Sequence, residues 1–313
     1  MLMKQEILQC NLSTSFQNAT GKIDYGLTND YMFRVILQRH INVLKALICA
    51  LLHLNLDEIK DVYVRNPIQP GEAVDDKEFV LDIEVLFNND TLINLEMQVL
   101  NELNWSERSL AYLCRLFASL YKGQDYDEAL SVVHIGFLDF QLFPEHPEFF
   151  GIYRLMNEKD HYLYSDKLTL GVVDLKHIEL ATEEDRAFQI DHWARLFKAT
   201  TWEEIKMIAE NNEYMTEATQ ALYEYNADYV IRQKCEAREE YERRQRTLHK
   251  KLSDAQEKIQ EQEDALEEQR KVLQEQNESL REKDSILQEQ HRLLKEQENE
   301  IERLKTLLAA STV

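Results

Sequence analysis

Apolar and polar residues alternate in two neighbouring runs in the first third of the chain, FVLDIEVLF at 79–87 and LINLEMQVL at 92–100. Successive side chains of a β-strand point to opposite faces, so each run has one apolar face and one acidic or amide face. The polar residues Asn88-Asn89-Asp90 between the runs are typical of a tight turn. We therefore expect two strands, over about 78–87 and 91–100, joined as a hairpin.

The pattern around this hairpin predicts an order of helix, three strands, helix and strand. Thr28 or Asn29 is the expected N-cap of the first helix, and Gly123 the expected end of the second. A crossover helix between the third and fourth strands implies a parallel pair, and hence a mixed sheet covered by helices. The predicted elements are a helix over 28–54, a strand over 59–65, the hairpin strands, a helix over 105–122, a strand over 130–143, short strands within 149–178 (for example 162–164 and 168–175) and helices within 182–232.

Beyond about residue 234 the sequence is typical of one long helix. An apolar residue recurs every seven positions, over more repeats than the three or four that indicate a coiled coil. The column three residues further on is mostly Gln, and polar core positions weaken a coiled coil. A coiled coil of two or more chains and a single solvated helix both remain open. The apolar column consists of Leu252, Ile259, Leu266, Leu273, Leu280, Leu287, Leu294, Ile301 and Leu308.

These patterns divide the chain into four predicted segments. We expect a partly ordered leader over 1–24, an α/β domain over 25–180, a helical extension over 181–234 and a heptad helix over 235–313. The chain has 313 residues, 44% of them hydrophobic, which suffices for a sizeable core. The 7 Gly and 4 Pro are too few for a turn-rich β-sandwich.

Composition excludes several classes of protein. The 4 Cys form no CxxC pair or Cys/His cluster, which argues against zinc and fits a reducing cytoplasm. No run reaches the roughly 18 apolar residues that span a bilayer. The mixed charges of the tail also argue against a helix lying on a membrane. The net charge of −22 counts against nucleic-acid binding unless a local cationic surface or a bound metal offsets it.

Two acidic residues of the hairpin are the strongest candidates for chemistry. If the apolar faces of the runs match, the simplest centred register places Asp82 opposite Glu96, with Cβ atoms roughly 4.5–5.5 Å apart. Carboxylates that close repel each other unless a cation lies between them, and oxygen-only ligands suit a hard divalent ion such as Mg²⁺. The alternative is a pair of solvent-facing carboxylates that meet by coincidence.

Other charged residues have two interpretations each. Arg108, Arg115 and Lys122 recur every seven residues on the second helix, so they share one face, which either contacts phosphates or is simply solvated. Asp30 is either an accessory acid near the hairpin or an ordinary acidic residue in the first turn of its helix.

Several segments, in this order, resemble the PD-(D/E)XK nuclease superfamily, and more narrowly its bacterial recombination-promoting nuclease and putative transposase family. The resemblance covers about 25–235 and implies a restriction-endonuclease-like fold that hydrolyses DNA phosphodiester bonds with Mg²⁺, or Mn²⁺. The matching segments are TNDYMFRVIL at 28–37, NP at 66–67, DDKEFVLDIEV at 75–85, INLEMQV at 93–99, ERSLAYLCRLFASLYKGQDY at 107–126 and VVHIGFLDFQLF at 132–143.

The resemblance also implies roles for individual residues. Asp82, Glu96 and the main-chain carbonyl of Met97 would bind the metal. Gln98 stands where the superfamily has Lys, so Lys77 or Arg108 would have to supply the missing cation.

Two functions follow from this reading of the sequence. The first is a cytoplasmic, Mg²⁺-dependent DNA endonuclease associated with recombination or transposition, assembled as a homo-oligomer through its heptads. The second is a catalytically weak or inactive nuclease fold that serves as an oligomeric interaction module. The first is the leading hypothesis, although the missing motif lysine and the net charge favour the second.

Overall fold

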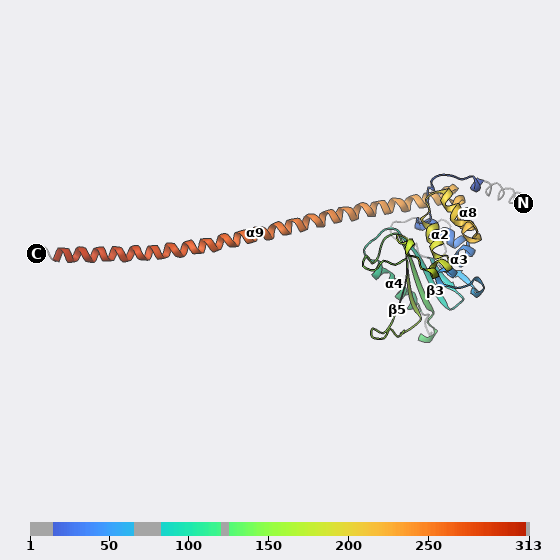
Figure 1. Cartoon of the computed structure of the whole chain (residues 1–313), viewed down its shortest axis with the longest axis horizontal. Helices are drawn as coiled ribbons and strands as arrows, with labels where there is room; N and C mark the ends of the chain where they lie inside the picture. The colour runs from blue at the N-terminus through green and yellow to red at the C-terminus, as the bar shows by residue number, and fades with distance from the viewer. Residues whose placement is uncertain (1–14, 66–82, 120–124, 311–313) are drawn as a thin grey trace, which may run out of the picture. The chain divides into compact units, whose positions relative to one another are not determined.

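The structure is a computed structural model that describes residues 15–65, 83–119 and 125–310, with side chains described as far as 305. The chain divides into two units, 1–244 and 245–313. Six strands of the first unit form one sheet, in the order β1-β2-β3-β4-β6-β5. Figure 1 labels β3 and β5 of this sheet. The strands are β1 (Val62–Val64), β2 (Ile83–Phe87), β3 (Thr91–Gln98), β4 (Ser131–Leu138), β5 (Phe150–Arg154) and β6 (Leu168–Asp174).

Helices cover both faces of this sheet, and one long helix follows it in the chain. The α-helices are α2 (Asp30–Arg39), α3 (Ile41–Leu52), α4 (Trp105–Phe117), α5 (Glu183–Ala187), α6 (Ile190–Lys198), α7 (Trp202–Ala209), α8 (Glu213–Ala227) and α9 (Tyr229–Ala310). Short 3₁₀ turns lie at η1 (Leu56–Glu58), η2 (Tyr126–Glu128) and η3 (Ile178–Leu180).

The sheet is mixed, as the sequence predicts. Strands β1, β2 and β3 pair antiparallel, β3, β4 and β6 pair parallel, and β5 is antiparallel to β6. The parallel β3–β4 pair is joined by α4, which is the predicted crossover helix. The expected strand at 162–164 is absent among the described residues, where Leu163 forms only an isolated bridge with Met156.

The hairpin has the register that the sequence predicts wherever it is described. Its pairs run from Ile83–Leu95 to Phe87–Thr91. Asn88 and Asn89 in the turn have φ of 49° and 62°, a left-handed conformation that Asn tolerates better than most residues. The part of the predicted strand before Ile83, which includes Asp82, lies outside the described residues.

The single helix predicted over 28–54 is wrong, because two helices meet there at an angle of 106°. The break falls at His40, whose ring nitrogens lie 2.9 Å from Glu217 Oε1 and 3.1 Å from the hydroxyl of Tyr225. Both partners lie on α8, so the sequence around His40 gives no local signal of the break. The predicted N-cap is confirmed at Asn29, whose side chain accepts a hydrogen bond from Met32 N.

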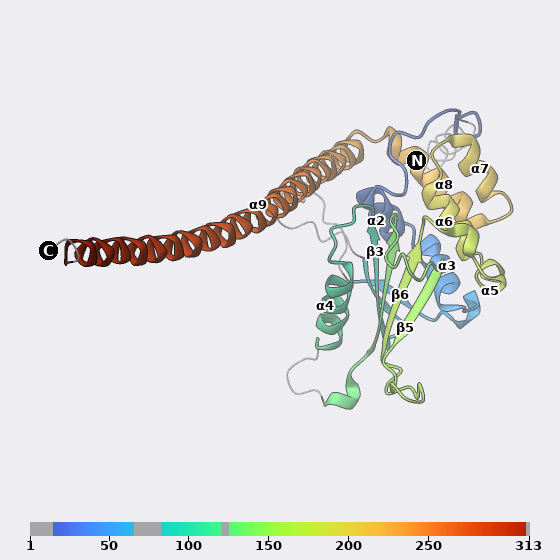
Figure 2. The ribbon, with the colours of Figure 1, turned by 60° about the vertical axis from the view of Figure 1, so that its left-hand side comes forward.

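The two faces of the sheet are covered differently. Helix α4 packs on one face, where Leu113 and Leu116 contact Leu92 and Val132. Helices α2, α3 and α6 lie on the other face, over the larger core (Figure 2). Residues 94, 96 and 98 of β3 therefore point toward the α4 side, and Ile93, Leu95 and Met97 point into the larger core.

The first turns of α9 belong to the same unit as the sheet. Cys235 is fully buried, and its carbonyl accepts a hydrogen bond from Asn29 Nδ2 at 3.1 Å. Within the described residues no single helix is long and apolar enough to cross a membrane, although the bent pair α2–α3 meets the length and composition criteria together.

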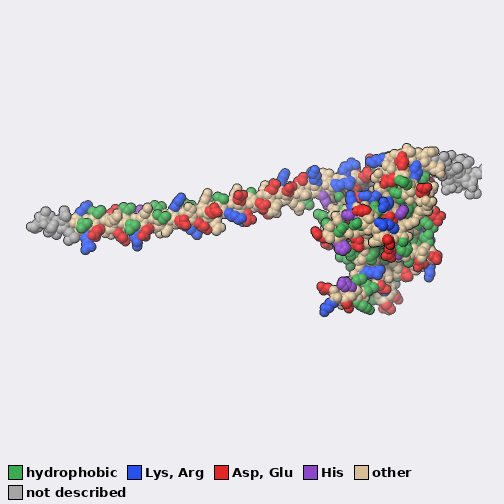
Figure 3. Space-filling model, in the orientation of Figure 1, with side chains coloured by type: hydrophobic (Ala, Val, Ile, Leu, Met, Phe, Trp, Pro, Cys, Tyr) green, Lys and Arg blue, Asp and Glu red, His purple; other side chains and the backbone are tan. Residues whose placement is uncertain are grey.

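The second unit is the continuation of α9 from Gln245. Acidic and basic side chains alternate along it (Figure 3). Its recorded ion pairs, such as Lys271–Glu267 and Arg292–Glu289, join residues three or four positions apart on the same helix. The apolar heptad residues from Leu252 to Ile301 are 52–59% exposed. The helix is thus confirmed, whereas the coiled coil remains a prediction.

Candidate functional site

Glu96 is a buried carboxylate near the end of β3, on the face that α4 covers. Its side chain is only 4% exposed, and its Oε1 lies 2.7 Å from a terminal guanidinium nitrogen of Arg108. Arg108 is in the first turns of α4, the helix that directly follows β3 in the chain. The crossover connection thus places a cation of the helix over an acid of the preceding strand. A charge buried this deeply is costly unless it is paired, so the contact stabilises the arrangement.

Arg108 makes further contacts that fix its guanidinium. It lies 3.4 Å from Glu102 and packs against the ring of Tyr112 at 5.5 Å. Burial acts to lower its pKa, but the carboxylate of Glu96, followed by Tyr112 and Glu102, raises the pKa above the usual arginine value. Arg108 is therefore a permanent cation at this site.

His134 and Asn94 are buried polar neighbours of Glu96 that are not among the predicted site residues. Asn94 Nδ2 lies 2.9 Å from His134 Nδ1, on the adjacent strand β4. If the amide donates there, the ring proton is on Nε2, which lies 4.0 Å from Glu96 Oε2. Burial, followed by the charge of Arg108, lowers the pKa of His134 to about 3, so the ring is neutral. The only sequence signals are that Asn94 lies on the polar face of β3 and that His134 interrupts an otherwise apolar stretch of β4.

Gly136 provides the space in which the start of α4 packs. It is the β4 partner of Glu96 in the parallel register. A Cβ at Gly136 would lie 2.0 Å from the Trp105 ring, far closer than atoms can approach. Trp105 is the first residue of α4 and is 3% exposed. The missing side chain therefore allows α4 to dock where Arg108 reaches Glu96.

A second buried acid, Asp30, lies at the start of α2. Its carboxylate accepts a hydrogen bond from Nε of Arg238 on α9, and Arg238 also lies 3.8 Å from Glu242. Burial raises the pKa of Asp30 to about 6, although Arg238 acts to lower it. The charge of Arg108 also acts to lower this pKa. Asp30 is thus more than a solvent-exposed acid of a first helical turn.

The remaining predicted side chains lie either outside the described residues or on the α4 side of the sheet. Asp82, Lys77 and Lys122 lie outside the described residues. The amide of Gln98 is on the same face as Glu96, and its Nε2 donates to Leu100 O at 2.9 Å. Arg115 is 60% exposed, and its ion pair with Glu84 is long, at 4.0 Å.

The main-chain carbonyl of Met97, rather than its side chain, is the predicted ligand. The Met97 side chain is buried in the larger core. The neighbouring carbonyl of Gln98 accepts a hydrogen bond from Asp139 N, next to β4. Successive carbonyls of a strand point to opposite neighbours, so the Met97 carbonyl points toward the β2 side, where the sequence places Asp82.

The residues present suit an oxygen-seeking cation. No group of three or more His, Cys, Asp or Glu that could bind a metal occurs within the described ranges, which do not include Asp82. Asn94 Oδ1 is buried and has no hydrogen-bond partner there. Glu96 and Asn94 thus present oxygen atoms on one face of β3. Such donors fit a hard divalent ion better than zinc or copper.

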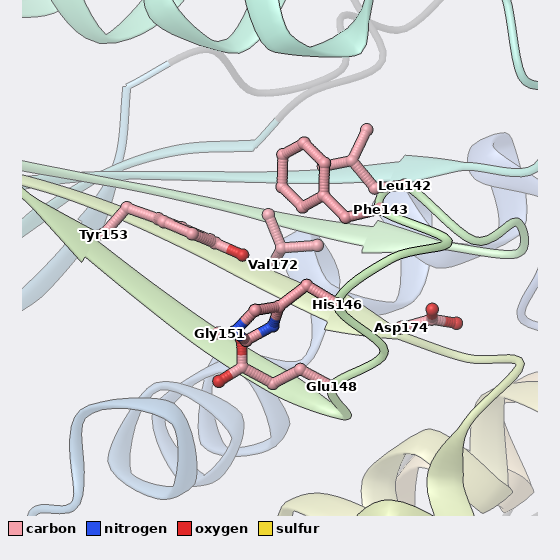
Figure 4. Close-up of a pocket in the computed structure, with 8 residues that line it drawn as sticks. All are labelled: Leu142, Phe143, His146, Glu148, Gly151, Tyr153, Val172 and Asp174. Carbon is pink, nitrogen blue, oxygen red and sulfur yellow. The ribbon is translucent and has the colours of Figure 1, made fainter.

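Two hollows lie away from Glu96. The first, between β5, β6 and the preceding loop, has a volume of about 20 Å³, roughly enough for one water molecule. Glu148 and Tyr153 reach over Gly151 there, where a Cβ would lie 2.6 Å from Glu148 Oε2 (Figure 4). The second, of about 350 Å³, is lined by α3, α5 and α6, with Cys49 and Trp193 among its residues. Neither contains a residue of the predicted site.

The mixed sheet, the crossover helix and the buried acid on the second hairpin strand define a nuclease-like α/β protein. Comparison with protein families then gives a direct assignment: the model of the PD-(D/E)XK nuclease family transposase matches residues 27–251. The chain belongs to this family, and the fold class predicted from the sequence is confirmed. At the level of the family, the protein is a nuclease and therefore a hydrolase. Comparisons with curated proteins and with solved structures gave no match.

Proposed function

We propose that the protein is a Mg²⁺-dependent DNA endonuclease that hydrolyses phosphodiester bonds during recombination or transposition. The observation that carries this proposal is the buried Glu96 carboxylate, which is paired with Arg108 on the strand where the resemblance in the sequence expects the motif acid. The described part of the hairpin has the register that predicts Asp82 across from Glu96.

In this proposal Asp82, Glu96 and the carbonyl of Met97 bind the ion, which can also be Mn²⁺. The ion would polarise the phosphate and lower the pKa of a bound water. Gln98 would orient the attacking water through its amide. Arg108 is the described cation next to Glu96 and would stabilise the charge that develops on the phosphate. Lys77 is the other candidate for this role, and Asp30 would act as an accessory acid.

DNA binding requires cations on a strongly acidic chain. Arg115 is exposed and stacks at 4.8 Å over Tyr112, on the same helix as Arg108. We propose that Arg115 contacts the DNA backbone, with Lys122 further along the chain.

The described cysteines, Cys49, Cys114 and Cys235, are free thiols, which supports a reducing, cytoplasmic location.

A supercoiled-plasmid nicking assay with Mg²⁺ tests the proposed chemistry. The variants are Asp82→Asn and Glu96→Gln, which remove a charge with little change of shape. We expect each to lose at least about 100-fold in rate, because several kcal/mol of charge stabilisation would disappear. The exposed Asp57→Asn variant is a matched control and should nick at the wild-type rate. Equal nicking by all four proteins would remove the assignment of this site.

We also propose that the heptad helix assembles the protein into a homo-oligomer. The exposed apolar column from Leu252 to Ile301 supports this proposal. If the wild type neither binds Mg²⁺ or Mn²⁺ in isothermal titration nor nicks DNA, but still assembles, the protein is an interaction module on a nuclease fold.

A further inference from the structure

The exposed apolar column of α9 suits a partner that presents a similar column. The apolar residues that recur every seven positions from Leu252 to Ile301 occupy the position called a in a heptad, and over half of the surface of each is exposed. Val272, Ile286 and Leu293 lie beside them at position g and are 48–58% exposed. Along roughly 75 Å of helix, this spacing keeps an apolar stripe on a single face, which is wider where g is also apolar. A second copy of the chain carries the same stripe with the same period.

The second core column is the one three residues after each apolar residue, position d. It consists of Ala255, Gln262, Gln269, Gln276, Lys283, Gln290, Gln297 and Leu304. The column four residues after, position e, is mostly charged: Gln256, Glu263, Arg270, Asn277, Asp284, His291, Glu298 and Lys305. A charge costs more to bury than an amide does, so the column at d faces the partner and the column at e remains at the edge.

The Leu residues at a and the Gln residues at d favour parallel over antiparallel pairing of the two helices. In a parallel, in-register pair, each Leu at a meets the same Leu of the second copy, and each Gln at d meets the same Gln. Amide side chains both donate and accept, so two facing glutamines can satisfy each other. Antiparallel pairing would instead place residues at a against residues at d, which buries each glutamine against a leucine and leaves its amide without a partner.

The charges at the edges favour the same arrangement. In a parallel pair, a residue at g faces the residue at e five positions later in the second copy. Lys258 then meets Glu263, and Glu300 meets Lys305, which are both opposite charges. No g–e pair between Lys251 and Lys305 joins like charges. Lys283, the charged residue at d, lies beside Asp284 at e of the second copy.

We infer that α9 pairs with a second copy of this chain as a parallel, in-register, two-stranded coiled coil. Two strands are favoured because the charged column at e stays at the solvent edge of a dimer and would be more deeply buried in a larger bundle. The cost of burying those charges exceeds what Val272, Ile286 and Leu293 at g would gain there. The inference rests on the homo-oligomer of the proposed function and makes it specific. It is independent of the nuclease chemistry.

Cysteine cross-linking of the full chain tests this pairing. In a background of Cys10→Ser and Cys114→Ser, each variant carries one new cysteine at d: Gln262→Cys, Gln276→Cys or Gln290→Cys. Matched controls carry the same change two residues earlier, at Gln260, Gln274 or Gln288, which occupy the outer position b. A disulfide requires Cα atoms about 4.4–6.8 Å apart, which in-register d positions allow and b positions do not.

All three d variants are expected to form disulfide-linked dimers on mild oxidation, at least roughly tenfold more than their b controls. Sedimentation should give the mass of a dimer. Cross-linking at only one d position would overturn the parallel register, because an antiparallel pair brings identical residues together only at its centre. A trimeric mass would overturn the two-stranded state. A monomeric mass without cross-linking would overturn the homo-oligomer itself, and plasmid nicking by that monomer would leave the nuclease proposal standing.

Discussion

The carboxylate of Glu96 and the guanidinium of Arg108, 2.7 Å apart, connect the central strand β3 to the helix that crosses over it. The acid is almost fully buried, whereas the arginine side chain is 31% exposed and can be reached from solvent. The pair thus neutralises the buried acid and holds α4 at the polar face of the sheet. A divalent ion bound by Glu96 would take over the first of these roles, and Arg108 would then be able to interact with a phosphate.

Replacing Arg108 with Gln should destabilise the protein by about 3 kcal/mol, because a buried charge loses its partner. Chemical denaturation without metal measures this. Arg115→Gln is the matched control on the same helix: its side chain is 60% exposed, and its contact with Glu84 is 4.0 Å long. It should cost less than about 1 kcal/mol. Equal costs for the two variants would show that the Glu96–Arg108 pair does not stabilise the fold.

The double variant Glu96→Gln/Arg108→Gln should be more stable than the sum of the single changes implies. In the double variant both side chains are neutral, so no buried charge is left without a partner. A double-mutant cycle measures this coupling, which we expect to exceed about 1 kcal/mol. Additive costs would contradict a direct interaction of the two side chains in solution.

Gly136→Ala should destabilise the protein by about 1–3 kcal/mol, because the added methyl group displaces the Trp105 ring and the start of α4. Thermal unfolding and tryptophan fluorescence measure the two effects. Gly26→Ala is the control, since a Cβ there meets only Ala199 O at 3.6 Å, an ordinary contact. A wild-type melting temperature for Gly136→Ala would contradict the tight seating of Trp105.

The buried Asp30 should make stability depend on pH. Its pKa is about 6 in the folded protein and 3.8 in the reference state, so the folded form binds the proton more tightly. The stability that this proton contributes is complete below about pH 4 and is lost as the pH rises through 6. The loss is on the order of 3 kcal/mol.

Denaturation of wild type and Asp30→Asn between pH 4 and 7 gives the free energy of unfolding of each protein, and the difference between the two measures the contribution of Asp30. As the pH rises, the free energy of unfolding of Asp30→Asn should increase relative to that of the wild type. Asp24→Asn is the control, because Asp24 pairs with Arg232 of α9 but is 59% exposed. A constant difference between wild type and Asp30→Asn would contradict the raised pKa.

A chain that ends at Arg244 should retain the stability of the first unit, whereas one that ends at Arg232 should lose more than about 3 kcal/mol. The shorter chain lacks the buried Cys235 and leaves Asp30 without Arg238. Circular dichroism and denaturation of the two chains measure the difference. Equal stability would show that the first turns of α9 contribute little to the unit.

Local patterns predicted the features that depend on residues close in the chain. Alternation predicted the β2–β3 hairpin, and the length of the crossover predicted the parallel β3–β4 pair. The N-cap at Asn29 and the long helix followed from local signals as well. Glu96 was identified because the alternation of the two runs places it on the polar face, opposite Asp82 in the predicted register.

By itself, the sequence determined the order of the hairpin, the crossover helix and the strand after it, the register of the hairpin and the heptad period of α9, because strand and helix periodicity are properties of short segments. Only the tertiary structure decided that Arg108 reaches Glu96, that His134 pairs with Asn94, and that Arg238 neutralises Asp30 from 208 residues away. Such contacts depend on how packed elements bring distant residues together. In a buried environment that proximity determines which charges must be paired and which pKa values shift.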